Sequence, residues 1–397
     1  MIFIVAHAPY WYEHLECRIV SNPLRWSTSK IRRNFVTKIV LMAAALSAAA
    51  QDRALLDTEG QIRSEIERVR KLIKDKPVTG TDFGNADKTV TDLLKASSDA
   101  LNVGMLYLSV ERLAQPVSFA NGVRAAEDKA EPLKSRLTAF QAEWNQAGVS
   151  LAAVDRDLRA RDWSRSPAAI RALSESALTR TSPLMSGSLG FATTTQPRDG
   201  LYYMGQALGE AEFARFCATL NLPRKRRAVP VRSMLTELQV LQEKTNAAFK
   251  PPRSIDQHPR FIALNATIKL ARELDAAKFY SGALYQYLEA LRRYAMLDTP
   301  LPEGAQRTAL KKSLKDWTAK LEASKDDASI AQLFVQRAEG YVTHADGSEP
   351  SNDEWTAAQV IIDQVLPAYF AARKAPLRTQ RSNGKTIAIT LVRWPYT

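Results

Sequence analysis

Four carboxylates, Glu111, Glu289, Asp353 and Glu354, are the sort of residues that acid–base chemistry would use, and Trp355 follows the last two directly. A glycosidase places two carboxylates on either side of a sugar, against which aromatic rings stack. No spacing selects these four from the 42 acidic residues of the chain. We therefore keep an envelope enzyme that acts on glycans through paired carboxylates as the alternative hypothesis.

The positions of the tryptophans discriminate between such an enzyme and a scaffold. Rings that line one open cleft beside two carboxylates would favour the enzyme, whereas rings buried between helices would favour the scaffold. The informative residues are Trp144, Trp163, Trp317 and Trp355.

The remaining reactive residues predict no metal site, no cofactor and no catalytic site. His258 and His344 lie in separate loops without metal-ligand spacing. Cys217 lies in an apolar helical run, which is typical of a buried thiol. The chain has no G-x-G-x-x-G, P-loop, H-E-x-x-H or G-x-S-x-G motif. We therefore favour a protein without enzymatic activity.

The charge pattern does not favour a nucleic-acid partner. The formal net charge is +13, from 55 basic and 42 acidic residues, but opposite signs alternate along most of the predicted helices. Nucleic-acid binding would need a continuous basic face with interleaved aromatic residues. The densest positive run, residues 224–227 (RKRR), is interpreted as a solvated loop; in an exported protein it is also suited to anionic lipid or polysaccharide.

The segment 267–294 (TIKLARELDAAKFYSGALYQYLEALRRY) has the pattern of a packed helical hairpin. Spacings of three and four residues place its contact side chains on one face of each helix. Small residues let the helices approach, and aromatic rings fill the gaps between them. The contact positions are Leu270, Ala271 and Leu274 in the first helix, then Tyr280, Ala283, Tyr287 and Ala290 in the second.

This hairpin resembles a tetratricopeptide repeat (TPR), which packs two antiparallel helices in the same order of small and aromatic residues. Weaker echoes occur at residues 204–220 and 338–362, where the turns differ in length. The resemblance implies stacked helical pairs whose concave face binds an extended protein or peptide partner. An ordinary α-hairpin remains the alternative reading of the same pattern.

The composition predicts that helices position all of these residues. Glycine is scarce, at 16 residues, whereas alanine, leucine, glutamate, lysine and arginine recur throughout. We predict an all-α fold of antiparallel helical hairpins, an irregular TPR-like array in two lobes, with a short C-terminal strand. The predicted parts are an N-terminal lobe (51–180), a linker (181–200), a TPR-like lobe (201–377) and a tail (378–397) whose strand covers 385–392.

Apolar periodicity and helix-ending residues predict the individual helices. Pro116 is expected to end the second of them, and the polar stretch 181–200 is expected to be irregular. The predicted ranges are 53–76, 86–115, 120–146, 150–162, 167–179, 201–220, 233–249, 261–274, 279–297, 305–323, 328–342 and 352–372.

Residues 1–50 are interpreted as an N-terminal extension and a secretory signal peptide. Basic residues precede a short apolar run at 39–46, and Ala48-x-Ala50 forms a cleavage site. The run is shorter than the roughly 20 residues of a membrane span. Export by a twin-arginine signal at Arg32-Arg33, a true start at Val36, and a buried first helix all remain open. We expect a bacterial protein, periplasmic or extracellular, without a transmembrane span in the mature chain.

These observations predict an exported, non-enzymatic helical protein that binds another protein or peptide in the cell envelope. A third hypothesis is a purely structural envelope component, for which the C-terminal strand would supply the assembly edge.

Overall fold

The fold is all-α, as the composition predicted. The computed structural model describes residues 57–75, 84–133, 137–194, 197–220, 222, 226–251, 255–344 and 347–374. Within these ranges the chain forms helices and no strand; an isolated parallel bridge joins Arg227 to Asp326. The predicted signal peptide and the predicted strand at 385–392 lie outside the described residues. No helix in these ranges is long and apolar enough to cross a membrane.

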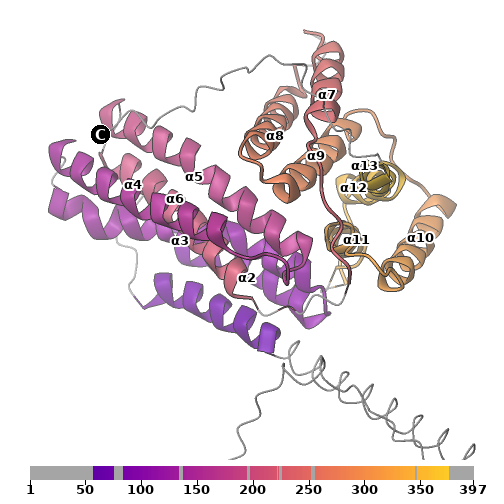
Figure 1. The fold of residues 1–397 in the computed structure, drawn as a ribbon, viewed down its shortest axis with the longest axis horizontal. Helices are drawn as coiled ribbons and strands as arrows, with labels where there is room; N and C mark the ends of the chain where they lie inside the picture. Colours follow the sequence, from indigo (N-terminus) through magenta and orange to yellow (C-terminus); the bar gives the residue numbers. More distant parts are fainter. Residues whose placement is uncertain are drawn as a thin grey trace, which may run out of the picture. The chain divides into compact units, whose positions relative to one another are not determined.

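The first group of helices is long and surrounds α6. Figure 1 shows these helices side by side, and α6 packs against α3, α4 and α5. Small residues such as Gly205 and Gly209 let neighbouring backbones approach α6 closely. After a helix over residues 57–74, the group consists of α2 (Ala86–Asn102), α3 (Leu106–Leu133), α4 (Leu137–Ala160), α5 (Ala168–Thr194) and α6 (Pro197–Thr219).

The second group consists of shorter helices that pack as consecutive hairpins. The closest pairs are α8 with α9 and α11 with α12, while α9 and α11 also pack against α5 of the first group. The predicted antiparallel hairpins are therefore present. The helices are α7 (Leu235–Ala248), α8 (His258–Ala276), α9 (Tyr280–Ala295), α10 (Ala305–Glu322), α11 (Ser329–Val342), α12 (Asn352–Val360), the π-helical turn η2 (Ile361–Val365) and α13 (Leu366–Lys374).

The prediction of one helix over residues 86–115 that ends at Pro116 is wrong in two respects. The chain turns at Gly104, whose φ is +78°, and α3 then runs through Pro116 without ending. Gly104 and Met105 donate to the carbonyls of Leu101 and Ala100, which closes α2 with a Schellman turn. Glycine adopts this left-handed conformation without a steric penalty. Packing of α3 against α6 outweighs the hydrogen bond that Pro116 removes.

The predicted irregular linker at 181–200 is corrected by the structure, because α5 continues to Thr194 and α6 begins at Pro197. Hydroxyl groups of this stretch donate hydrogen bonds to backbone carbonyls of the same helix. Thr181 and Ser188 each donate to the carbonyl one turn earlier, at 2.7 Å. Such local bonds keep serine and threonine compatible with a helix that tertiary packing holds. The stretch therefore belongs to two packed helices that make extensive contact with each other.

Candidate functional site

The seven predicted hairpin residues all lie in the α8–α9 pair. Four of them are fully buried: Ala271, Leu274, Ala283 and Ala290 each have 0% exposure. The other three, Leu270, Tyr280 and Tyr287, are half-buried. The buried aromatic ring of α9 is instead that of Tyr285, which the sequence pattern did not select. Whether this hairpin belongs to the TPR class stays a prediction.

The turn between α8 and α9 is a Schellman motif with an unusual residue in it. Phe279 donates to the carbonyl of Leu274 at 2.8 Å, and Lys278 donates to that of Asp275 at 2.9 Å. Lys278 has a φ of +62° and is the only residue other than glycine with a positive φ in the described part of the chain. A side chain in this conformation costs about 1–2 kcal/mol relative to a right-handed one. Strained residues other than glycine are common at functional sites, so the side chain of Lys278 is a candidate functional group.

Replacing Lys278 with glycine is expected to raise the free energy of unfolding by about 0.5–1 kcal/mol. Glycine removes the strain of the left-handed conformation, but it also increases the conformational entropy of the unfolded chain, which cancels part of the gain. Lys278→Ala is the matched control, since alanine keeps a Cβ and therefore the strain. Chemical denaturation of the three proteins measures the difference. An equal gain from alanine would show that the backbone at this position is not strained.

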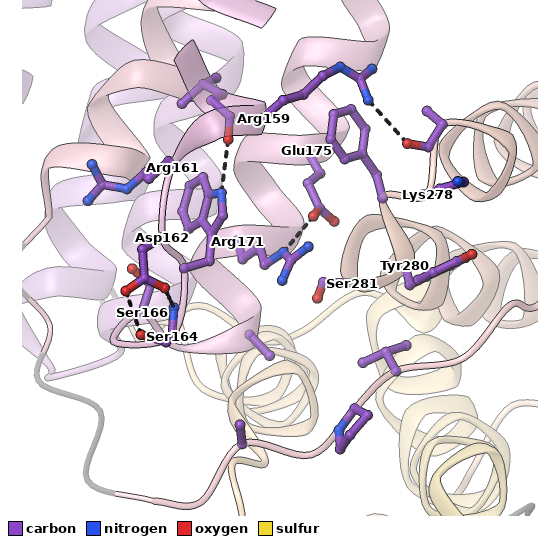
Figure 2. Close-up of a pocket in the computed structure, with 18 of the residues that line it drawn as sticks. Arg159, Arg161, Asp162, Ser164, Ser166, Arg171, Glu175, Lys278, Tyr280 and Ser281 are labelled. Carbon is purple, nitrogen blue, oxygen red and sulfur yellow. Dashed lines mark hydrogen bonds and ion pairs between the residues drawn. The ribbon is translucent and has the colours of Figure 1, made fainter. Parts of the chain in front are cut away.

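A pocket of about 680 Å³ opens beside this turn. Three segments line it: the turn between α4 and α5, the turn between α8 and α9, and residues 228–231. Figure 2 shows side chains from these segments facing a common space. Phe279 and Trp163 are among the lining residues, and Trp163 donates its indole N–H to the carbonyl of Leu158 at 3.1 Å. The pocket thus combines aromatic surface with polar groups.

Positive charge predominates in this pocket. Arg159, Arg161, Arg171 and Lys278 line it, and the lining contains two carboxylates. The Asp162 carboxylate accepts hydrogen bonds from the backbone and hydroxyl of Ser164, both at 2.8 Å, and these bonds lower its pKa. The other carboxylate, Glu175, is buried.

Glu175 joins α5 to the N-terminus of α9. Its carboxylate accepts from Arg171 Nε at 2.6 Å and from the Gly282 backbone N–H at 2.7 Å. Burial raises its pKa, against the lowering effect of the Arg171 guanidinium. This close contact favours glycine at position 282, because a Cβ there would lie 2.8 Å from a terminal methyl of Leu274 and 3.0 Å from the Cβ of Glu175.

The third wall of the pocket, residues 228–231, has no helix or strand structure and is fixed at both ends. At one end Arg227 exchanges backbone hydrogen bonds with residues 325 and 327, at 3.1 and 2.8 Å. At the other end Ser233 Oγ and the Met234 N–H both donate to the buried Asp275, at 2.8 and 2.6 Å. Between these anchors, the backbone of residues 228–231 makes no hydrogen bond to any described residue.

Two of the carboxylates considered for catalysis meet in a separate, buried ion-pair network. Arg337 on α11 donates to Glu289 at 2.6 Å and to Tyr285 at 2.9 Å, and it forms an ion pair with Glu111 on α3. Glu289 also accepts from Arg292 at 2.7 Å and from Arg293 at 3.0 Å. The guanidinium groups, Arg337 foremost, lower the pKa of Glu289 far below its usual range despite its burial. Both carboxylates are therefore ion-pair partners of the same arginine.

The other two carboxylates lie elsewhere and have ordinary roles. Asp353 makes an exposed ion pair with Arg260 at 3.3 Å. Glu354 completes the capping box of α12 with Ser351, and it also contacts His344 at 3.0 Å. The structure does not bring these two residues together with the Glu111–Glu289 pair.

The four tryptophans do not share one cleft. Trp355 is 3% exposed, whereas the other three rings are half-buried against the core. Trp144 donates to Met185 on α5, and Trp317 stacks on Phe370 with ring centroids 5.6 Å apart. Of these rings, Trp163 is the one that lines the pocket.

Metal binding has no support among the described residues, where no group of three or more histidine, cysteine or acidic side chains is suited to hold an ion. Cys217 is a buried free thiol, as its apolar surroundings predicted. Comparison with protein families, with curated proteins and with solved structures found no match for this chain.

Proposed function

We propose that this protein is an exported, non-enzymatic helical protein of the bacterial cell envelope, which binds an acidic segment of another protein or peptide. The binding site in this proposal is the basic pocket between α5, the α8–α9 turn and residues 228–231. The observation that carries the proposal is the excess of cationic over acidic side chains in the lining, four against two.

Two of these cations have no ion-pair partner among the described residues, which favours an acidic ligand. Arg161 lies 5.3 Å above the Trp163 ring and makes no ion pair with a described residue. Lys278 likewise has no ion-pair partner there, and it occupies a strained backbone position beside the pocket. Unpaired cations next to aromatic surface attract an acidic chain and orient it as it approaches.

The non-helical wall of the pocket favours a peptide as the ligand. Residues 228–231 lie outside any helix or strand, and their backbone groups make no hydrogen bond to a described residue. A peptide that lies along such a segment gains main-chain hydrogen bonds in addition to charge contacts. Because both ends of the segment are anchored, it loses little conformational entropy when a partner binds.

The glycan-enzyme alternative has weaker support. Glu111 and Glu289 are both engaged by Arg337 in a buried ion-pair network, so neither faces an open site as a catalytic acid must. The dispersed tryptophans likewise offer no shared stacking surface. The proposed export rests on the basic and apolar pattern of residues 30–50, which lie outside the described part of the chain.

A photocrosslinking experiment tests the proposal. We expect p-benzoylphenylalanine in place of Tyr280 to form a covalent product with one envelope protein in the native host, because Tyr280 lines the pocket and is half-exposed. The same photoreactive residue in place of Val149, which is 73% exposed on α4 away from the pocket, is the control. Identical products from both positions, or none from position 280, would contradict the proposal.

A further inference from the structure

We infer that the pocket holds a carboxylate of the partner between the Arg171 guanidinium and the N-terminus of α9, with the Ser281 hydroxyl as a donor. This inference rests on the proposed function and names the chemical group that the site recognises. Three observations lead to it: a helix end that its own residues do not cap, a hydroxyl without a described partner on a largely buried residue, and an arginine with unused donors.

The N-terminus of α9 opens into the pocket without a cap from its own residues, although Glu175 on α5 accepts the Gly282 N–H. The N-cap residue, Phe279, has no capping side chain, and the first turn contains no acidic residue. Tyr280 and Ser281, the first two residues of this 16-residue helix, both line the pocket. The N–H groups and the dipole of a helix N-terminus favour a negative charge there.

Ser281 provides an independent sign that a ligand binds at this helix end. Ser281 is only 6% exposed, and its hydroxyl makes no hydrogen bond to any described residue, although its oxygen is still reached by solvent from the pocket. Polar groups of largely buried residues normally bond to protein or to an ordered water. Figure 2 shows the hydroxyl of Ser281 facing the same space as the Arg171 side chain. A ligand acceptor in that space would satisfy this hydroxyl.

Arg171 has donors left over for the same ligand. Its Nε is bonded to Glu175, and its two terminal nitrogens make no hydrogen bond to a described residue. The guanidinium side chain is 38% exposed, so these nitrogens are accessible from the pocket. A planar carboxylate matches two guanidinium donors better than a point anion does.

Glu175 shows that the space between Arg171 and the N-terminus of α9 already stabilises a carboxylate. It uses one donor from Arg171 and one backbone N–H from α9, which are the two kinds of donor proposed for the ligand. A second carboxylate beside it would be repelled, and two features offset this repulsion. Burial raises the pKa of Glu175, which eases its protonation, and Arg159 and Lys278 add positive charge around the site.

The test uses the full mature chain and labelled peptide pools in fluorescence anisotropy. Three pools have the same length: one with a free C-terminal carboxylate and no acidic side chain, one amidated with a central glutamate, and one amidated with a central glutamine. We expect at least one carboxylate pool to bind about tenfold more tightly than the neutral pool. The preferred pool tells whether the carboxylate is a chain terminus or a side chain.

Ser281→Ala should remove most of that tenfold preference, since hydrogen bonds to charged groups are worth about this factor. The variant should keep the thermal stability of the parent, because the hydroxyl it removes has no partner in the protein. Ser150→Ala, at an exposed serine of α4 that does not line the pocket, is the matched control and should keep the preference.

Equal binding of all three pools would overturn the inference, as would a preference that survives both Ser281→Ala and Arg171→Lys. A different result contradicts the proposed function, namely the absence of a partner crosslinked to position 280. A crosslinked partner whose yield is unchanged by Ser281→Ala would leave the proposed function standing and remove the carboxylate site.

Discussion

Replacing Arg337 with methionine is expected to lower the free energy of unfolding by about 3–5 kcal/mol. The Arg337 guanidinium is the common partner of Glu111 and Glu289, and all three side chains are at most 15% exposed. Methionine fills similar space but leaves two buried carboxylates with fewer counter-charges. Urea denaturation at pH 7 measures the loss. Arg260→Met is the control, because its exposed pair with Asp353 should contribute about 0.5 kcal/mol or less.

The dependence of this loss on pH provides a second readout. In the parent protein the pKa of Glu289 is lowered, so its stabilising effect is complete above the unfolded value of about 4.5 and declines as the pH falls below it. Without Arg337 the pKa of Glu289 rises and part of this effect is absent. The difference between parent and variant should therefore shrink as the pH falls from about 5. A difference independent of pH would mean that lost packing, not lost charge, destabilises the variant.

Gly205→Ala is expected to cost about 1–3 kcal/mol, although alanine is the better helix former by about 1 kcal/mol. A Cβ at Gly205 would lie 2.5 Å from the carbonyl oxygen of Asn121 and 2.6 Å from the Cβ of Ala125. Both neighbours belong to α3, and the nearer atom is backbone, so relief requires the two central helices to separate. The change in melting temperature and in unfolding free energy measures the cost.

Gly148→Ala on α4 is the matched control for this crossing. No atom lies within 4 Å of a Cβ at Gly148, so alanine should stabilise the protein there by about 0.5–1 kcal/mol. Opposite signs at the two glycines are the expected pattern. If both substitutions stabilise the protein, α3 and α6 do not pack as closely as the structure has them.

The sequence was most informative where periodicity and helix-ending residues agree. The α8–α9 hairpin lies close to its predicted position, and its small contact residues Ala271, Ala283 and Ala290 are buried. The prediction failed at Pro116 and at 181–200, where local residue preferences oppose the helix. There, burial against α6 decides the conformation, and such a distant contact leaves no periodic signal in the local sequence.

The candidate site was largely out of reach of sequence reasoning. Glu111 and Glu289 were singled out as acids, but their shared partner, Arg337, follows Glu111 by 226 residues. The pocket likewise combines residues from three distant segments, so no motif encloses them. Lys278 is the one position with a local signal, because the end of α8 in a helical hairpin is a place where glycine is usual. A lysine at such a position is therefore an unusual residue that the sequence alone displays.

The central claim is that charge in this pocket recruits an acidic segment of a partner, and Lys278→Glu tests it most directly. The measurement is the yield of the crosslink from position 280 in the native host, compared with Lys312→Glu at an exposed site on α10 outside the pocket. We predict that Lys278→Glu lowers the yield at least tenfold, while Lys312→Glu leaves it unchanged. An undiminished yield in Lys278→Glu, or an equal loss in both variants, would contradict the account.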